Sequence, residues 1–176
     1  MKTLLLVSIG LICGLDVCGQ PPKRYDTCAF IGQYQGEWRY ENGSDTVRIY
    51  LRVHKYYSHD IRVVTQTLIG WHEYKQGNVV IESDYSHRFD PLTYNWDTDT
   101  TKFSIMLSLD QCSNSCLALN GSIVDLLQSD EIKDVKAILD SGKTQMSWTQ
   151  KHGEGVGMVS HAHGMTLPPQ FALIKQ

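Results

Sequence analysis

Two histidines near the C-terminus have the spacing of metal ligands. His161 and His163 lie in the stretch GMVSHAHGM, with one residue between them. Alternate residues of a strand face the same side, so both imidazoles would reach one metal ion such as zinc. The third ligand would be Glu154 or a distant histidine such as His72 or His87. A metal-dependent enzyme using His161 and His163 is one hypothesis, and polar loop histidines are the simpler interpretation.

Aromatic side chains are the second group that suggests a site. The chain has four Trp and nine Tyr residues. Small-molecule pockets are mostly apolar, with a few placed polar groups. Inward-facing tryptophans would either line such a pocket or fill the interior of the fold. The residues that we assign to ligand binding are Trp38, Tyr40, Trp71 and Trp148.

The remaining motifs do not predict a cofactor or a catalytic residue. The stretch GEGVG lacks the Lys-Ser/Thr pair of a phosphate-binding loop, and no Gly-x-Ser-x-Gly is present. The acidic stretch DTDTT lacks the spacing of an EF-hand calcium loop. Asp97 and Asp99 within it are expected to be solvated loop residues rather than an acid-base pair.

The first residues have the form of a secretory signal peptide. Lys2 precedes an apolar run that ends near Leu15, and small or short residues follow up to Gly19. This run is too short to anchor the chain across a bilayer. We therefore expect a signal peptide over residues 1–19, a single domain over 20–176, no transmembrane segment, and a secreted or periplasmic location.

Charge and cysteine content restrict the partners. The net charge is -3 and no basic cluster is present, so nucleic acid is not an expected partner. The expected mature chain keeps Cys28, Cys112 and Cys116, which allow one disulfide and one free thiol in an oxidising compartment. Pairing Cys28 with either of the other two closes the longer loop and is slightly favoured. The odd cysteine permits a disulfide dimer without indicating one.

Alternating hydrophobicity predicts that the elements carrying these residues are strands. Asn42-Gly43 is a strong hairpin signal, because both residues accept a positive φ. After this turn the apolar residues occupy every second position, with polar ones between them. These apolar residues are Val47, Ile49, Leu51 and Val53. Residues 34–53 are therefore predicted to form the first hairpin.

Similar patterns continue to the end of the chain. Strands are predicted in 61–75, with a bulge near Gly70, and in 79–84, 102–109, 117–127 and the last six residues. Residues 130–139 have both helical and strand features, and we favour strands. The hairpin turns are frequent and no βαβ alternation occurs. The fold class is therefore predicted to be all-β, an antiparallel up-and-down barrel, with a β-sandwich as the alternative.

Three stretches carry a family resemblance, namely GEWRYENGSDTVRIYL, LIGWHEYKQGNVVIES and TLPPQFALIKQ. They resemble an uncharacterised family of short secreted β-proteins of Bacteroidota. The Gly-x-Trp at Gly36 to Trp38 is also similar to the start of the first strand in lipocalins. The resemblance implies a secreted, lipocalin-like or calycin-like barrel, and it implies no activity.

These observations favour a non-catalytic binding protein. The first hypothesis is a lipocalin-like barrel that binds a small apolar or amphipathic molecule in its interior. The second is the metal-dependent enzyme described above. The third is a structural or interaction module of the cell envelope.

Overall fold

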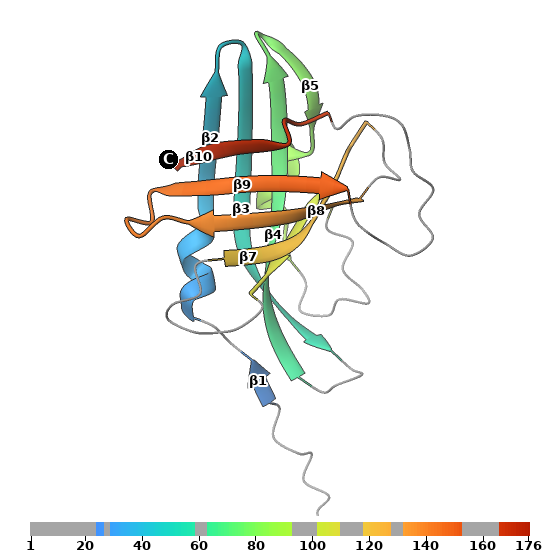
Figure 1. Cartoon of the computed structure of the whole chain (residues 1–176). Helices are drawn as coiled ribbons and strands as arrows, with labels where there is room; N and C mark the ends of the chain where they lie inside the picture. The colour runs from blue at the N-terminus through green and yellow to red at the C-terminus, as the bar shows by residue number, and fades with distance from the viewer. Residues whose placement is uncertain are drawn as a thin grey trace, which may run out of the picture.

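Ten β-strands and two short 3₁₀ helices are present in the computed structural model, which describes residues 24–26, 29–58, 63–92, 102–109, 118–127, 132–152 and 166–176. Figure 1 shows their arrangement. In chain order the elements are β1 (Arg24–Asp26), η1 (Ala29–Tyr34), β2 (Gly36–Asn42), β3 (Asp45–Ser58), β4 (Val63–Gln76), β5 (Val79–Ser83), η2 (Tyr85–Phe89), β6 (Ile105–Ser108), β7 (Ala118–Val124), β8 (Ile132–Leu139), β9 (Gln145–His152) and β10 (Gln170–Lys175).

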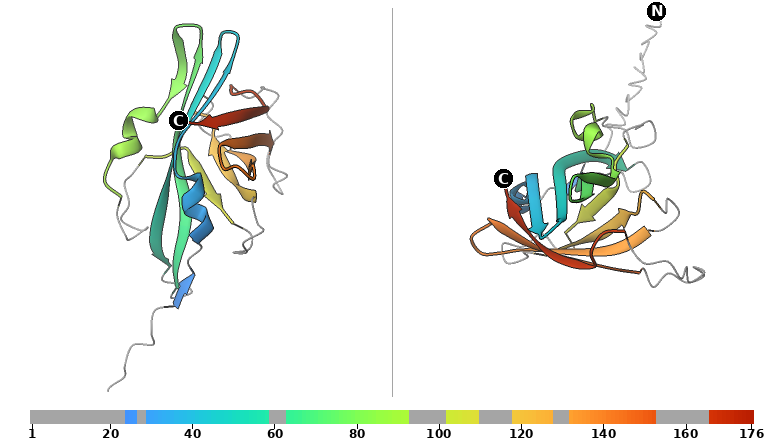
Figure 2. Two further views of the ribbon diagram at one scale, coloured as in Figure 1. Left: turned by 90° about the vertical axis from the view of Figure 1, so that its left-hand side faces the viewer. Right: turned by 90° about the horizontal axis from the view of Figure 1, so that it is seen from above.

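Eight of these strands, all except β1 and β5, form a closed antiparallel barrel. Each pairs with the next barrel strand in the sequence, and the ring closes where β10 pairs with β2. Strand β5 is not part of this ring, and β4 instead pairs with β6 over a short antiparallel stretch. Strands β7 to β10 form one wall that faces β2 to β4, as the two views in Figure 2 show. The predicted all-β, up-and-down barrel is confirmed, and the sandwich alternative is not the architecture.

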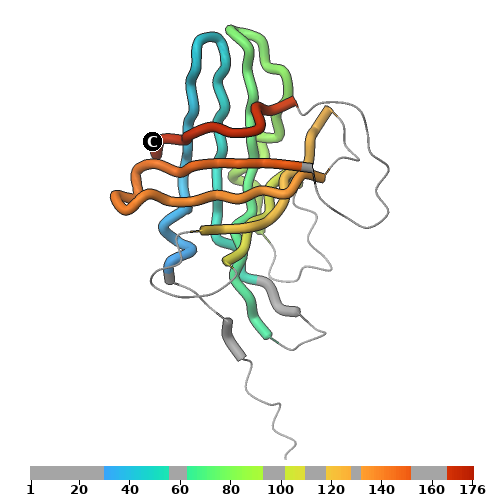
Figure 3. The backbone as a smooth tube through the Cα atoms, viewed as in Figure 1, coloured from blue at the N-terminus to red at the C-terminus, as the bar shows by residue number. Residues whose placement is uncertain are grey.

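Strand β4 organises one side of the barrel because three strands pair along the same edge. Residues 63–65 pair in parallel with β1, 68–70 pair with β6, and 73–76 pair with β5. The register against β5 shifts between Tyr74 and Lys75, which is where a bulge occurs. The bulge expected near Gly70 is absent from the pairing of β3 with β4, which continues through Gly70 without a shift. The hairpins β2–β3 and β4–β5 extend beyond β10 at the top of Figure 3.

Two predicted elements are confirmed with their detailed pairing. The β2–β3 hairpin turns at Gly43, whose φ of 60° is the left-handed conformation that an Asn-Gly turn provides. Within the ambiguous segment 130–139, residues Ile132–Leu139 form strand β8, with a strict alternation of buried and exposed side chains. Its period of two places Val135 and Leu139 in the core, and this burial outweighs the local helical spacing.

The inward faces of the strands form a single hydrophobic core. Trp38, Ile49 and Trp148 have no exposed surface, and the cluster continues through the inward residues of β6 to β10. Trp71 does not belong to this core. It pairs with Tyr50, whereas the inward residue Ile49 pairs with His72, so Trp71 lies on the outer face of the barrel. The expectation that Trp71 faces inward is therefore wrong, and the next residue of β4, His72, faces inward instead.

Candidate functional site

One end of the barrel is closed by η1. The indole Nε1 of Trp38 donates to the carbonyl oxygen of Tyr34 at 2.7 Å, and Tyr34 is 1% exposed. The ammonium of Lys175, on the last strand, lies 5.2 Å from the centre of the Trp38 ring and donates to the carbonyl oxygen of Gln33. This cation–π contact and the two hydrogen bonds join η1, β2 and β10 across the barrel end. Because that end is packed, a ligand would have to enter elsewhere.

The middle of the barrel contains stacked aromatic rings. Phe171 lies 6.1 Å from the Trp148 ring in a stacked arrangement and 5.2 Å from the Tyr40 ring. Trp38 and Trp148 are fully buried, so no void as large as a water molecule touches either side chain. Tyr40 is half-buried and shares the inward face of β2 with Trp38. Of the predicted ligand-binding residues, Tyr40 is therefore the accessible one inside the barrel.

The opposite end of the barrel contains inward-facing ionisable side chains. His72 pairs with Ile49 and Glu82 pairs with Tyr74, so both lie on the inner faces of β4 and β5. His72 Nδ1 is hydrogen bonded to Ser104 Oγ at 2.7 Å. His72 Nε2 lies 3.3 Å from Glu82 Oε1, close enough for attraction, but neither atom makes a well-aligned hydrogen bond. Both side chains have no exposed surface.

Asp84 extends this polar cluster beyond β5. Its Oδ1 accepts the backbone N–H of His72 at 2.7 Å and lies 3.9 Å from the imidazole Nδ1. Burial raises the pKa of the Asp84 carboxyl above its ordinary value, although the His72 charge and the backbone hydrogen bond act in the opposite direction. A buried carboxyl of this kind is more easily protonated than one in water.

Strands β8 and β9 and the segment that follows β7 contribute further polar groups to the same end. Lys133 is 1% exposed and lies on the inner face of β8 with Val135. Gln150, on β9, donates through Nε2 to the carbonyl oxygen of Pro168 at 2.9 Å. The second carboxylate oxygen of Glu82 accepts the backbone N–H of Leu126 at 3.0 Å, which joins β5 to the segment after β7. These contacts tie together strands from both walls.

Asp125 fixes the segment that leads into β10. Its two carboxylate oxygens accept the backbone N–H and the hydroxyl of Thr166, each at 3.0 Å. Leu167, the next residue, is 3% exposed and belongs to the core cluster. The polar end of the barrel is therefore held by specific bonds rather than by apolar contact alone.

The chemistry that this cluster can perform is limited by its burial. Ser104, His72 and Glu82 have the residue types of an acyl-transfer site, but they are 3%, 0% and 4% exposed. A substrate would reach Ser104 Oγ only if the surrounding side chains moved. Among the described residues, no group of three His, Cys, Asp or Glu side chains is placed to hold a metal ion.

Trp71 instead belongs to a cluster on the outer face. Its indole Nε1 donates to the carbonyl oxygen of Lys102, and the Arg52 guanidinium lies 5.8 Å from its ring. Beside it, η2 places Tyr85 between two guanidinium groups, with Arg48 4.4 Å and Arg88 4.3 Å from the ring centre. This outer cluster holds η2 against β3 and β4.

Several sequence-based predictions concern residues outside the described ranges. The proposed metal ligands His161 and His163 lie there, as do Cys28, Cys112 and Cys116. Those predictions remain predictions. Within the described ranges, no helix is long and apolar enough to span a membrane.

The inward polar cluster was missed from the sequence, although a signal for it existed. His72 and Tyr74 have the parity that places a residue inward on β4, and extending the alternation from the first hairpin would have assigned His72 to the interior. Glu82 could not be assigned in this way, because the bulge at Tyr74 and Lys75 changes the register of β5.

Comparison with known proteins identifies a family but no activity. A family model described as "Family of unknown function (DUF6705)" matches residues 1–176. No curated protein and no solved structure gives a significant match to this chain. Any functional assignment must therefore come from the geometry described above.

Proposed function

We propose that this chain, which belongs to the family of unknown function DUF6705, is an exported barrel protein that binds a small amphipathic molecule at the polar end of its barrel. No catalytic step is included in the proposal. The polar end is defined here by His72, Glu82, Lys133 and Gln150, which face inward from β4, β5, β8 and β9.

The observation that carries the proposal is the difference between the two ends of the barrel. One end is closed by η1, Tyr34 and Trp38, whereas the other end contains ionisable groups in its interior. Burying charged or strongly polar side chains is costly, and well-packed apolar residues would give a more stable core. Such a cluster inside one end of a barrel is therefore a candidate for ligand recognition.

Aromatic rings adjoin the polar groups and provide the apolar part of the proposed site. Tyr40 is half-buried and contacts Phe171, the first inward residue of β10. Tyr74 pairs with Glu82, so a ring and a carboxylate lie side by side on the inner face. An amphipathic molecule would place its apolar part against Tyr40 and Phe171 and its polar group toward His72 and Glu82, once the side chains that enclose those two groups move. Trp38 and Trp148 would form the packed floor below it.

The export part of the proposal depends on the leader predicted over residues 1–19. A protein with this leader would be released on the far side of the membrane as residues 20–176. Intact mass measurement of the protein recovered from periplasm and from culture medium tests it. A polypeptide that keeps residues 1–19 in every fraction contradicts export.

Ligand binding can be tested with a fluorescent amphiphile. The mature protein is titrated with dansyl-undecanoic acid, and fluorescence enhancement is compared between wild type, Tyr40→Ala and Trp71→Phe. We expect the wild type to bind, Tyr40→Ala to bind about tenfold more weakly because it loses an aromatic contact, and Trp71→Phe to bind as the wild type because Trp71 lies outside the barrel.

Native mass spectrometry of the freshly purified protein provides a second measurement. A co-purified small molecule that dansyl-undecanoic acid displaces would support the proposal. The proposal fails if the wild type neither carries a bound molecule nor enhances the fluorescence of the probe. Equal loss of binding in Tyr40→Ala and Trp71→Phe, with unchanged circular dichroism, would contradict the location of the site.

A further inference from the structure

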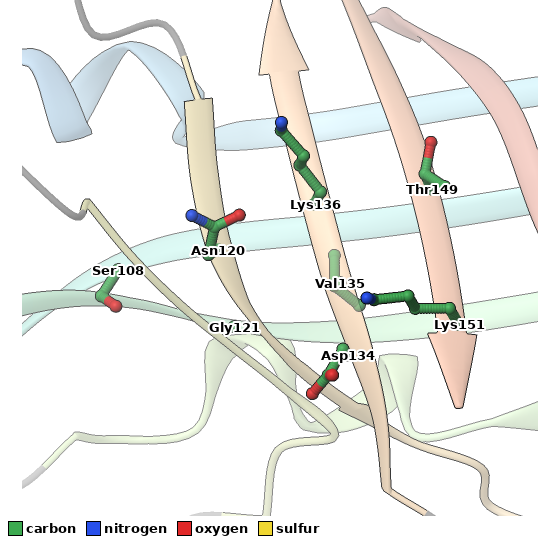
Figure 4. A pocket seen from close by; sticks show the side chains of 8 residues that line it. All are labelled: Ser108, Asn120, Gly121, Asp134, Val135, Lys136, Thr149 and Lys151. Atoms are coloured by element: carbon green, nitrogen blue, oxygen red, sulfur yellow. The ribbon is translucent and has the colours of Figure 1, made fainter. Parts of the chain in front are cut away.

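The outer face of β6 to β9 contains a groove of about 640 Å³ that plays no part in the barrel interior. Figure 4 shows its lining. Its polar side chains come from four successive strands, and all six are half-buried or exposed. They are Ser108, Asn120, Asp134, Lys136, Thr149 and Lys151. Its volume lies within the range of about 300–1,000 Å³ that is typical of small-molecule sites.

The strand register explains how these side chains come together. Ser108 pairs with Asn120, Asn120 with Lys136, and Lys136 with Thr149, which makes one row across four strands. Directly paired residues on one face have Cβ atoms about 4.5–5.5 Å apart, so neighbours in this row can contact the same small molecule. The row presents a hydroxyl, an amide, an ammonium and a second hydroxyl.

A second row lies beside the first and adds charges of both signs. Asp134 pairs directly with Lys151 across β8 and β9. The Lys151 side chain extends from β9 toward Val135 of β8 in Figure 4, so its ammonium lies over the groove. With Lys136 in the first row, the groove holds two ammonium groups and one carboxylate. The excess of positive charge is local, since the whole chain has a net charge of -3.

The shape of this face depends on Gly121, which lies between the two rows on β7. A Cβ atom at Gly121 would come within 2.0 Å of the carbonyl oxygen of Met106 and 2.8 Å of Leu107 Cα. Only glycine permits this approach of β6 to β7. The residue contributes backbone rather than a side chain to the groove lining.

We propose that this groove is a second binding site, separate from the barrel interior, and that it takes a sugar acid, a small molecule with several hydroxyls and one carboxylate. The carboxylate matches the ammonium groups of Lys136 and Lys151. The hydroxyls match the acceptors and donors of Asp134, Asn120 and Thr149, and Asp134 in particular accepts from hydroxyl groups while disfavouring a second anionic group nearby. The groove contains no aromatic ring among its lining residues, so an apolar ligand has little to contact there.

Isothermal titration calorimetry with D-glucuronate, D-glucose and acetate tests the inference. D-glucose keeps the hydroxyls without the carboxylate, and acetate keeps the carboxylate without the hydroxyls. We expect D-glucuronate to bind at least about tenfold more tightly than either, because charge-assisted and neutral hydrogen bonds both contribute. A uronate trisaccharide is included to identify the source of the ligand. Tighter binding of the trisaccharide indicates an acidic polysaccharide, and equal binding indicates the free sugar acid.

A pair of charge-matched variants locates the site. Lys136→Gln/Lys151→Gln should weaken D-glucuronate binding at least about tenfold. Lys55→Gln/Lys143→Gln removes the same charge from exposed positions outside the groove and should leave binding unchanged. All four lysines are exposed, so both variants are expected to fold.

Three results would overturn the inference. They are D-glucuronate binding that is no tighter than D-glucose binding, unchanged binding in the groove variant, and an equal loss in the charge-matched control. The site is independent of the barrel interior, so D-glucuronate is not expected to displace dansyl-undecanoic acid. Competition between the two ligands would show that they share one site and would also overturn the inference.

Discussion

The indole nitrogen of Trp38 donates a hydrogen bond to the carbonyl oxygen of Tyr34 at 2.7 Å, and this bond fastens η1 across one end of the barrel. This contact explains why a glycine stands two positions before the tryptophan in the Gly-x-Trp motif. Gly36 has a φ of 120°, a conformation that non-glycine residues rarely adopt, and it turns the chain from η1 into β2. Two residues later, the Trp38 side chain points back under η1. The motif is therefore part of the closed end and not of the proposed ligand site.

Replacing Trp38 should destabilise the protein through both packing and hydrogen bonding. Trp38→Phe keeps a ring in the core but removes the hydrogen bond to the Tyr34 carbonyl oxygen, and we expect a loss of about 1–3 kcal/mol in the free energy of unfolding. Trp38→Ala should lose about 3–5 kcal/mol. Urea denaturation followed by circular dichroism measures both. A Trp38→Phe protein as stable as the wild type would show that the bond to Tyr34 contributes nothing.

Substitution of Gly121 should be costly for a steric reason. An alanine Cβ would overlap backbone atoms of Met106 and Leu107, so β6 and β7 would have to separate. We expect Gly121→Ala to lose about 1–3 kcal/mol of unfolding free energy. Gly32→Ala is the matched control, because no heavy atom lies within 4 Å of the corresponding Cβ position. Equal stability of the two variants would contradict the close approach.

The fold was predictable from the sequence because its signals are local and repeated. Alternation across β3 and the turn at Gly43 fix the first hairpin, and the same reasoning applied to each later hairpin leads to an up-and-down barrel. The alternation in β8 is also local, although helical spacing competes with it between Ile132 and Leu139. The segment forms a strand rather than a helix because the strand buries one complete apolar face.

The interior site was less predictable because it depends on register and on distant contacts. His72 faces inward and its neighbour Trp71 faces outward, so an error of one residue in register exchanges them. The sequence favours the aromatic residue Trp71 as the site candidate. The contact of Glu82 with His72 further depends on the bulge in the pairing of β4 with β5. Ser104 approaches His72 from a segment 32 positions away, a relation that no local pattern encodes.

The carboxyl of Asp84 gives a pH-dependent contribution to stability. Because burial raises its folded-state pKa above the unfolded value, its contribution is fully present below the unfolded pKa and is lost as pH rises through the folded pKa. Asn at this position mimics the protonated form at every pH. We therefore expect Asp84→Asn to gain stability relative to the wild type as pH rises from about 3 to 7.5, because the wild-type carboxyl of pKa about 3.9 when unfolded ionises over this range.

Asp140 is the control for this measurement because its shift has the opposite sign. Its oxygens accept backbone N–H groups of Gly142, Thr144 and Gln145 in the β8–β9 turn, and these bonds lower its pKa. Asp140→Asn should therefore lose stability relative to the wild type as pH rises. Urea unfolding of the three proteins across the same pH range makes the comparison. If the stability relative to the wild type changes with pH in the same direction for both variants, the raised pKa of Asp84 is contradicted.

The phenol of Tyr85 should ionise at a higher pH than an ordinary tyrosine does. Burial raises its pKa to about 12, the Arg48 charge acts in the opposite direction, and the hydrogen bond to Glu37 raises the pKa further. The contribution of Tyr85 to stability is therefore fully present below the unfolded pKa of about 10 and is lost as pH rises through the folded value. Absorbance at the phenolate band, compared between wild type and Tyr85→Phe, isolates this residue among the nine tyrosines.

The phenolate absorbance of the wild type and of Tyr85→Phe should differ only near pH 12. Circular dichroism must show that both proteins are folded at that pH. Glu37→Gln removes the negative charge that helps to raise the pKa of Tyr85 and leaves a neutral amide oxygen as acceptor, so the same transition should move to lower pH. A difference that already appears near pH 10 would mean that Tyr85 is exposed to water. It would then follow that η2 does not pack against β3 through the Arg48 guanidinium, and that the outer cluster around Trp71 is open in solution.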